Sequence, residues 1–321
     1  MDQGLLSVGL MKAFADSRSQ QNPAAALKVA PLHRVDDDAH LGQYIPLHYH
    51  GQMLANEQRM NPFHEAIDKL VPLGAHVVEL GGGTGILSFL AAKRARKVTM
   101  IERLPHVAAT ARRLLAANGV SDKVTVVEGD ARRFVPDEPA DVVICEMLHA
   151  ALVREKQIEV VKAFKAGHVA QFGLAVPLFI PEATILGVQP IFQPYDFHGY
   201  YAPVPFFFEA GVPGVNTVEM GEPKVYSVID YREAFPESFS VEERLTADRA
   251  GTINALRFIT KNPVGIFAAE GRSADWHMPY MSLALPYPIP VEAGSSIRVR
   301  FQYDAGASVE SLQASIQGFP A

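Results

Sequence analysis

Cysteine, basic runs and long apolar runs are scarce or missing in this chain of 321 residues. The single cysteine, Cys145, excludes an intramolecular disulfide and is typical of a reducing compartment. Without an apolar run of 18 residues there is no transmembrane-helix signal, and the N-terminus, with an acid at Asp2, does not resemble a signal peptide. A net charge of −6 without a basic run argues against nucleic-acid binding. We therefore expect a cytoplasmic protein with no nucleic-acid partner and no membrane contact.

What the sequence does contain is a strand, a glycine-rich turn and a helix in direct succession. Residues 77–80 predict a short buried strand, residues 81–85 read Gly-Gly-Gly-Thr-Gly, and residues 86–95 have a helical apolar pattern. Glycines let the backbone approach a ligand closely. Residues 97–101 predict a second strand ending at Glu102, where an acid can accept hydrogen bonds from both hydroxyls of a ribose. The unit therefore predicts nucleotide binding.

The turn does not fit a dinucleotide. Neither Gly81 nor Gly83 begins a full G-x-G-x-x-G match. The stretch from Glu79 to Gly85 instead resembles motif I of the class I S-adenosylmethionine methyltransferases, E-x-G-x-G-x-G. Their cofactor has no phosphate, so an acid at Glu79 is acceptable. The resemblance implies a Rossmann-like fold, S-adenosylmethionine as cofactor and S-adenosylhomocysteine as product, held in part by Glu79, Gly81, Gly83 and Glu102.

A second acidic position follows the strand expected at residues 124–127. The resemblance implies that Asp130, with Ala131 beside it, accepts a hydrogen bond from the adenine amino group. A helix N-cap is the plainer interpretation of Asp130, and the two roles can coexist.

The helix expected before the glycine turn resembles that of the protein arginine methyltransferases. Residues 50–59 correspond to the family pattern H-E-E-M-L-x-D-x-x-R, with Met53 and Arg59 at the family spacing and Asn56 in place of the aspartate. The resemblance implies that Met53 packs on the cofactor and that Arg59 pairs with its carboxylate. Tyr44 matches the second tyrosine of a Y-F-x-x-Y segment that folds over the cofactor.

A pair of glutamates carries the chemistry. Residues 140–145 predict a buried strand ending at Glu146, and Glu155 follows nine residues later. Glu146, Leu152 and Glu155 match the family's double-glutamate loop, S-E-x-M-G-x-x-L-x-x-E. A guanidinium is a poor nucleophile because its charge is delocalised and its pKa exceeds 12. Two carboxylates can hold and orient it through charge-assisted hydrogen bonds. Taken singly, Glu146 could be an ordinary strand-end residue and Glu155 a solvated helix residue.

The loop between the glutamates departs from the family at Met147, Leu148, His149 and Ala150. The resemblance implies that these positions shape the pocket around the substrate side chain. A small guanidino compound is therefore at least as good a candidate acceptor as a peptide arginine.

The length and ordinary globular composition suggest two domains or one large one. We expect an N-terminal leader or helix over residues 1–39, a Rossmann-like domain over 40–180 with a helix that Pro62 must end or kink, and an antiparallel β-barrel-like domain over 181–321. Strands are expected throughout this last part, including residues 309–317. The resemblance implies a homodimer formed by part of the aromatic-rich segment 192–215; an ordinary aromatic core loop is the alternative.

The chain's only tryptophan lies where the family has a T-H-W loop facing the active site. Trp276 matches the family tryptophan, and Asp275 replaces the histidine that pairs with the aspartate found here as Asn56. Two hypotheses follow for Asp275: a re-formed hydrogen bond to Asn56, or contact with a cationic group of the substrate. We place Asp275 and Trp276 with Glu146 and Glu155 in the catalytic set.

The histidines His48, His50 and His64 do not predict a metal site, because zinc needs three or four convergent ligands and no cysteine lies nearby. The sequence predicts an S-adenosylmethionine-dependent N-methyltransferase acting on a guanidino nitrogen of free arginine, a small molecule or a peptide. The alternatives are a small-molecule O- or N-methyltransferase that reuses the fold and a non-catalytic, cofactor-binding partner subunit.

Overall fold

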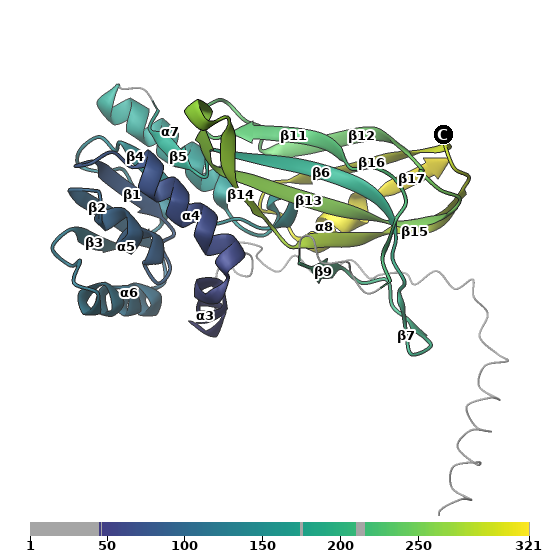
Figure 1. The fold of residues 1–321 in the computed structure, drawn as a ribbon, viewed down its shortest axis with the longest axis horizontal. Coiled ribbons are helices and arrows are strands. Elements are labelled where there is room, and N and C mark those ends of the chain that lie inside the picture. Colours follow the sequence, from purple (N-terminus) through teal and green to yellow (C-terminus); the bar gives the residue numbers. More distant parts are fainter. Residues whose placement is uncertain (1–44, 46, 174–175, 210–215, 321) are drawn as a thin grey trace, which may run out of the picture. The chain divides into compact units, whose positions relative to one another are not determined.

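A five-stranded parallel sheet forms the first half of the structure. The computed structural model describes residues 45, 47–173, 176–209 and 216–320, without the side chains of residues 47 and 48, so the expected leader and Tyr44 lie outside the described residues. The strands are arranged in the order β3-β2-β1-β4-β5 (Figure 1). They are β1 (His76–Leu80), β2 (Lys97–Glu102), β3 (Val124–Glu128), β4 (Val142–Cys145) and β5 (Leu178–Ile180).

The central strands of this sheet are buried on both faces, as a parallel sheet flanked by helices requires. The order reverses at β1, which pairs with β2 on one side and β4 on the other. Ligands of such sheets bind at the carboxyl ends of the strands beside this reversal. Helices α5 (Ile86–Ala92), α6 (Pro105–Ala117) and α7 (Gln157–Phe172) connect the strands, with short helical turns η1 (Ala131–Arg133) and η2 (Ala150–Leu152).

The helical segment before the sheet divides at Asn56 rather than at Pro62. It consists of α3 (Leu47–Ala55) and α4 (Glu57–Leu70). Of the two effects expected of Pro62, ending the helix is excluded because Pro62 lies inside α4. Asn56 begins α4 by accepting a hydrogen bond from the Arg59 backbone N–H at 3.1 Å. Such a cap satisfies a backbone donor at the start of a helix. The cap therefore fixes where the helix that carries Arg59 begins.

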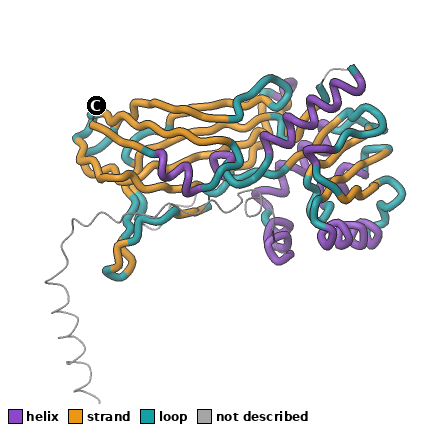
Figure 2. Tube along the Cα trace, turned by 180° about the vertical axis from the view of Figure 1, so that it is seen from behind, coloured by secondary structure: helices purple, strands orange, loops and turns teal. Residues whose placement is uncertain are grey.

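The second half is β-rich and antiparallel, as expected, and Figure 2 shows its strands gathered apart from most of the helices. One sheet combines β6 (Ala183–Phe192), β9 (Phe206–Phe208), β10 (Val218–Glu219), β11 (Lys224–Asp230), β13 (Gly251–Phe267), β14 (Arg272–His277) and β15 (Tyr280–Val291). A second combines β12 (Ser238–Thr246), β16 (Ser296–Asp304) and β17 (Gln317–Pro320). A hairpin of β7 (Asp196–Phe197) and β8 (Tyr200–Tyr201) projects from β6 (Figure 1).

One expected strand is a helix. Residues 309–315 form α8 (Val309–Ser315), and only the residues after it form a strand, β17. The Ser308 side chain caps α8 by accepting from the Ser311 backbone N–H, and Val309, Leu312 and Ile316 are buried at helical spacing. The strand prediction for this segment is wrong because its apolar residues recur every three to four positions. No helix in the described part of the chain is long and apolar enough to cross a membrane.

Candidate active site

The glycine turn follows β1 and closes on side chains from two other segments. Gly81, Gly83 and Gly85 have φ values of 75°, 57° and 87°, a region that side chains disfavour. A Cβ added to Gly81 would lie 2.5 Å from the Met147 sulfur, and one added to Gly83 would lie 2.9 Å from a His50 ring carbon. The turn therefore needs glycine both for its backbone conformation and for its close packing.

The two acids of the turn have different surroundings. Glu102 ends β2, and its carboxylate accepts hydrogen bonds from the Gly83 N–H at 2.9 Å and the Leu104 N–H at 2.8 Å. Glu79 is fully buried in β1 and accepts from the Ser88 backbone N–H at 2.9 Å and from the Ser88 hydroxyl. Burial raises the pKa of Glu79 to about 7, and the Ser88 hydrogen bonds oppose that rise. Glu79 thus ties β1 to α5, while the Glu102 carboxylate is held at the edge of the turn.

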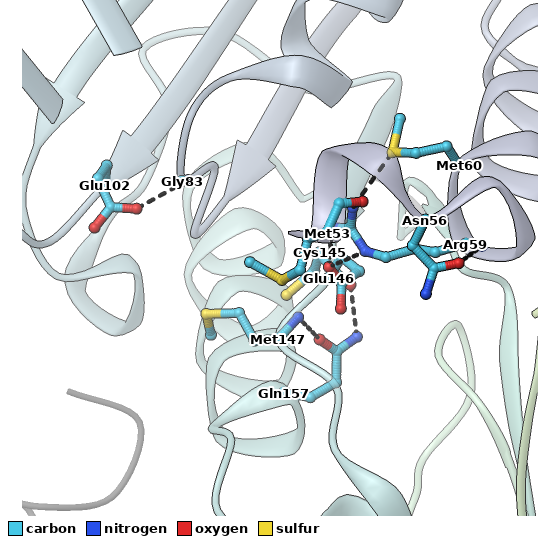
Figure 3. Close-up of polar contacts among 10 residues, drawn as sticks. All are labelled: Met53, Asn56, Arg59, Met60, Gly83, Glu102, Cys145, Glu146, Met147 and Gln157. Carbon is cyan, nitrogen blue, oxygen red and sulfur yellow. Dashed lines mark hydrogen bonds and ion pairs between the residues drawn. The ribbon is translucent and has the colours of Figure 1, made fainter. Parts of the chain in front are cut away.

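An arginine–glutamate pair joins α4 to the end of β4 (Figure 3). Both Nε, at 3.0 Å, and Nη2 of Arg59 donate to Oε2 of Glu146, and both side chains are about nine-tenths buried. The Arg59 guanidinium also lies 5.9 Å from the ring centres of Phe63 and Trp276. Among the described residues, Oε1 of Glu146 accepts no hydrogen bond. Arg59 therefore orients Glu146 and leaves one of its oxygens available.

Glu155 is the second carboxylate of the loop. It is partly buried, and its side chain forms no hydrogen bond within the described ranges. Burial and the charge of Glu146 raise the pKa of Glu155 to about 7, against the opposing charge of Arg154. Glu146 and Glu155 line the same cavity as the glycine turn. The site therefore brings two acceptor carboxylates to the place where the turn would hold its ligand.

The backbone between the two glutamates is unusual. Ala151, Leu152 and Arg154 have φ values of 55°, 57° and 67° although none is glycine. Such residues cost of order 1–3 kcal/mol each and cluster at functional sites. The β-rich half holds the segment in place: the Thr260 hydroxyl accepts from the Ala151 N–H at 2.7 Å, and the Ala307 carbonyl accepts from the Arg154 N–H at 2.7 Å. Contacts from distant segments therefore fix this loop.

Asp130 is a helix N-cap, the plainer of the two interpretations that the sequence left open. It caps η1 by accepting from the Arg132 N–H at 3.0 Å, and its carboxylate also pairs with the Arg132 guanidinium. The hydrogen bond from the Arg132 guanidinium lowers the pKa of Asp130. Asp130 and Ala131 line the cavity at the end of β3.

Ten of the predicted site residues line one cavity at the carboxyl ends of the parallel strands. They are Met53, Arg59, Glu79, Gly81, Gly83, Glu102, Asp130, Ala131, Glu146 and Glu155. The remaining predicted residues, apart from the undescribed Tyr44, are Asp275 and Trp276, and neither lines this cavity. Trp276 is buried behind Arg59, and its ring packs edge-on against Phe63 at 5.9 Å between centres.

The hypothesis of a re-formed Asn56–Asp275 hydrogen bond is wrong. Asn56 caps α4, as described above, and Oδ2 of Asp275 pairs with the Lys261 ammonium at 2.7 Å. Register explains the second contact, because Lys261 and Asp275 lie on adjacent antiparallel strands, β13 and β14.

The altered positions of the loop have distinct surroundings. Met147 packs on Gly81, as its distance to the added Cβ indicates. The His149 ring lies edge-on to Phe207 of β9 at 5.6 Å, and burial lowers the pKa of His149 to about 4. The family glycine is thus replaced by a neutral imidazole that contacts the β-rich half.

Sequence reasoning missed Gln157, the first residue of α7, which is buried and bonds to the backbone on both sides of Glu146. A signal was present. Gln157 lies on the same helical stripe as the buried residues Val161, Phe164 and His168, and a polar residue on such a stripe needs a hydrogen-bond partner.

Comparisons with known proteins agree with this geometry. Residues 77–166 match the family described as "Methyltransferase domain". An uncharacterised protein of Methanothermobacter thermautotrophicus is 29% identical over 84% of this chain and 97% of its own length. A probable protein arginine N-methyltransferase 6 of Arabidopsis thaliana is 30% identical over 58% of this chain and 40% of its own. The structure of the Trypanosoma brucei PRMT1 enzyme-prozyme heterotetrameric complex with AdoHcy superposes with a TM-score of 0.67 at 19% identity, covering 84% of this chain and 97% of that one.

The parallel sheet, the glycine turn and the matched domain define a class I methyltransferase whose cofactor is S-adenosylmethionine. Within that class, the chain is similar to a probable protein arginine N-methyltransferase over part of its sequence, and it shares the fold of the PRMT1 structure, with an antiparallel β-rich half after the Rossmann-like core.

The residues present fit this cofactor. The turn places the carboxylates of Glu79 and Glu102 where a phosphate would be repelled, whereas a nucleoside without phosphate is accepted. The oriented Glu102 carboxylate lines the cavity beside the bare backbone at Gly81 and Gly83, and a carboxylate can accept hydrogen bonds from ribose hydroxyls.

Proposed function

We propose that this protein transfers a methyl group to a guanidino nitrogen of arginine, either free, in another small molecule or in a peptide. The observation that carries the proposal is the convergence of Glu146 and Glu155 on the cofactor cavity, one held by Arg59 and the other without a hydrogen-bond partner among the described residues. A guanidinium has donors on several nitrogens and can bridge two carboxylates at once.

The cofactor residues take the following proposed roles. Glu102 binds the ribose hydroxyls, Asp130 and Ala131 bind the adenine, and Gly81 and Gly83 let the backbone approach. Met53 packs on the cofactor. Arg59 contacts its carboxylate while keeping its bonds to Glu146, since Nη1 of Arg59 makes only two weak contacts, to the Met53 carbonyl at 3.4 Å and to the Met60 sulfur at 3.3 Å.

The glutamates then divide the chemistry. When bound, S-adenosylmethionine supplies an electrophilic methyl group on a positively charged sulfur. Oε1 of Glu146 and the carboxylate of Glu155 hold the acceptor guanidinium and aim one nitrogen at that methyl group. Entry of the cation lowers the pKa of Glu155 and ionises it. Methylation of a guanidinium that kept all its protons would give a doubly charged product, so the nitrogen that gains the methyl group loses a proton, and the ionised Glu155 carboxylate accepts it.

Mass spectrometry tests this proposal directly. The wild-type protein is incubated with S-adenosylmethionine and a panel of free arginine, other small guanidino compounds and arginine-rich peptides. We expect a mass gain of about 14 units, one CH₂, on at least one guanidine. Glu155→Gln should abolish this gain, whereas Glu222→Gln, which changes an exposed glutamate of the β-rich half, should retain it. If no guanidine is methylated while S-adenosylhomocysteine still raises the melting temperature, the acceptor assignment is wrong.

We further propose that the protein is a homodimer that uses the β7–β8 hairpin. Tyr200 and Tyr201 are 72% and 63% exposed there, and Phe197 is also exposed. Exposed aromatic side chains of this kind mark contact surfaces. Replacing Tyr200 and Tyr201 together by serine should convert the dimer to a monomer in sedimentation velocity; a wild-type protein that sediments as a monomer would refute the assignment.

A further inference from the structure

The side-chain amide of Gln157 brackets Glu146. Its Nε2 donates to the Cys145 carbonyl at 2.9 Å, and its Oε1 accepts from the Met147 N–H at 3.0 Å (Figure 3). Cys145 is the last residue of β4, so the amide occupies the place of a neighbouring strand just beyond the strand's end. The backbone on both sides of Glu146 is thereby fixed by a single side chain.

Gln157 is also close to Glu155 along the chain. Gln157 begins α7 and stands two positions after Glu155. Movement of Gln157 relative to β4 would therefore change the separation of the two carboxylates. The loop between Glu146 and Glu155 cannot set this separation alone. Its left-handed residues, such as Ala151 and Leu152, cost free energy and persist only where surrounding contacts hold them.

A buried polar chain supports Gln157 from the β-rich half. The Tyr231 hydroxyl interacts with the Gln157 side chain and hydrogen bonds to the Thr184 hydroxyl at 2.8 Å. The Thr184 hydroxyl donates to the Asn262 side chain at 2.7 Å, and Asn262 contacts the Trp276 carbonyl. Gln157, Tyr231, Thr184 and Asn262 are each at most 1% exposed. Buried networks of this kind are rigid when every member is satisfied.

We propose that Gln157 is a positioning residue that sets the separation and orientation of Glu146 and Glu155. The proposal rests on the function proposed above, because positioning matters only if both glutamates hold the acceptor. Gln157 acts through the backbone beside Glu146 and does not itself line the cavity.

Two substitutions on the same helix test it. Gln157→Met keeps the length of the side chain and its helix propensity but removes both hydrogen bonds. Gln171→Met is the matched control, since Gln171 is an exposed residue of α7 that donates to the Pro136 carbonyl. Kinetics on whichever guanidine the wild type methylates, the melting-temperature shift with S-adenosylhomocysteine, and the pKa of Glu155 are measured for each. The pKa is followed by ¹³C NMR with carboxyl-labelled glutamate, assigned by the signal missing in Glu155→Gln.

We expect Gln157→Met to lower kcat on the order of 10- to 100-fold, because a displacement near 1 Å has that effect on positioned groups. The shift with S-adenosylhomocysteine should remain. Glu146 and Arg154 are the charged groups that act on the pKa of Glu155. Release of Glu146 should therefore bring this pKa down from about 7 towards the ordinary value. Gln171→Met should change none of these quantities.

Three results would overturn the proposal. One is an unchanged kcat in Gln157→Met, and another is an unchanged pKa of Glu155. The third is a loss of activity matched by an equal loss of S-adenosylhomocysteine binding, which would mean that Gln157 only maintains the fold. If the wild type methylates no guanidine, the proposed function fails, yet the pKa measurement still decides whether Gln157 positions the glutamates.

Discussion

Ionisation of the Glu155 side chain is predicted to lower the free energy of unfolding. Its pKa is about 7 in the folded protein against 4.5 for an unperturbed glutamate, so the folded state holds a proton that the unfolded state has already released between these values. Stability therefore falls as pH rises through this window, because the unfolded state binds fewer protons. The rise in pKa corresponds to about 3 kcal/mol once the pH exceeds 7, at about 1.36 kcal/mol for each pH unit.

Glu155→Gln removes the titrating group and keeps its shape. Relative to wild type, we expect it to stabilise the protein by about 1 kcal/mol at pH 5 and about 3 kcal/mol at pH 8, while abolishing methyl transfer. Urea unfolding at the two pH values, without cofactor or acceptor, measures the difference. The buried Glu79, whose pKa is raised to a similar value, titrates in both proteins and cancels in the comparison.

Glu222→Gln is the control, since Glu222 is exposed, and its effect on stability should be small and equal at both pH values. The reasoning is refuted if Glu155→Gln changes stability equally at pH 5 and pH 8, because the carboxylate would then carry no cost of desolvation. It is also refuted if the variant is less stable at pH 8, because the ionised group would then be a stabilising one.

Three further predictions concern the ion pair, the turn and a buried histidine. Arg59→Ala leaves Glu146 buried without its partner and should cost about 3–5 kcal/mol in urea unfolding, with loss of the melting-temperature shift on adding S-adenosylhomocysteine; retention of that shift would exclude Arg59 from cofactor binding. Gly81→Ala should weaken S-adenosylhomocysteine binding at least tenfold by calorimetry, since φ is 75° and the new methyl group meets Met147. An affinity equal to that of the wild type would show that the backbone and Met147 accommodate the methyl group, and would contradict the prediction. Burial lowers the pKa of His168, so the unfolded state takes up a proton first as pH falls below about 6.5, and stability is lost there. The decline in melting temperature from pH 7 to pH 5 should be smaller in His168→Gln, and an identical decline would contradict this assignment.

The sequence alone determined the cofactor half of the protein. A strand, a glycine turn and a helix are contiguous in the chain, and their pattern depends on local periodicity and on backbone freedom at Gly81 and Gly83. The carboxyl ends of parallel strands meet at one edge of the sheet, which is why Glu102, Asp130 and Glu146, each at or just after the end of a strand, line one cavity. The family pattern supplied Arg59 and Glu155 at fixed spacing.

The tertiary structure alone decided how these residues are held. Arg59 and Glu146 are 87 positions apart, and Ala151 and Thr260 are 109 positions apart, so no local sequence pattern predicts either contact. The division of the helical segment before β1 into α3 and α4 depends on the cap at Asn56, and the start of α8 depends on the cap at Ser308. Gln157 could be recognised as the residue between the two glutamates only after β4 and α7 were placed side by side. Local sequence fixes which groups reach the site, whereas their orientation and pKa values depend on buried contacts between segments that are distant in the chain.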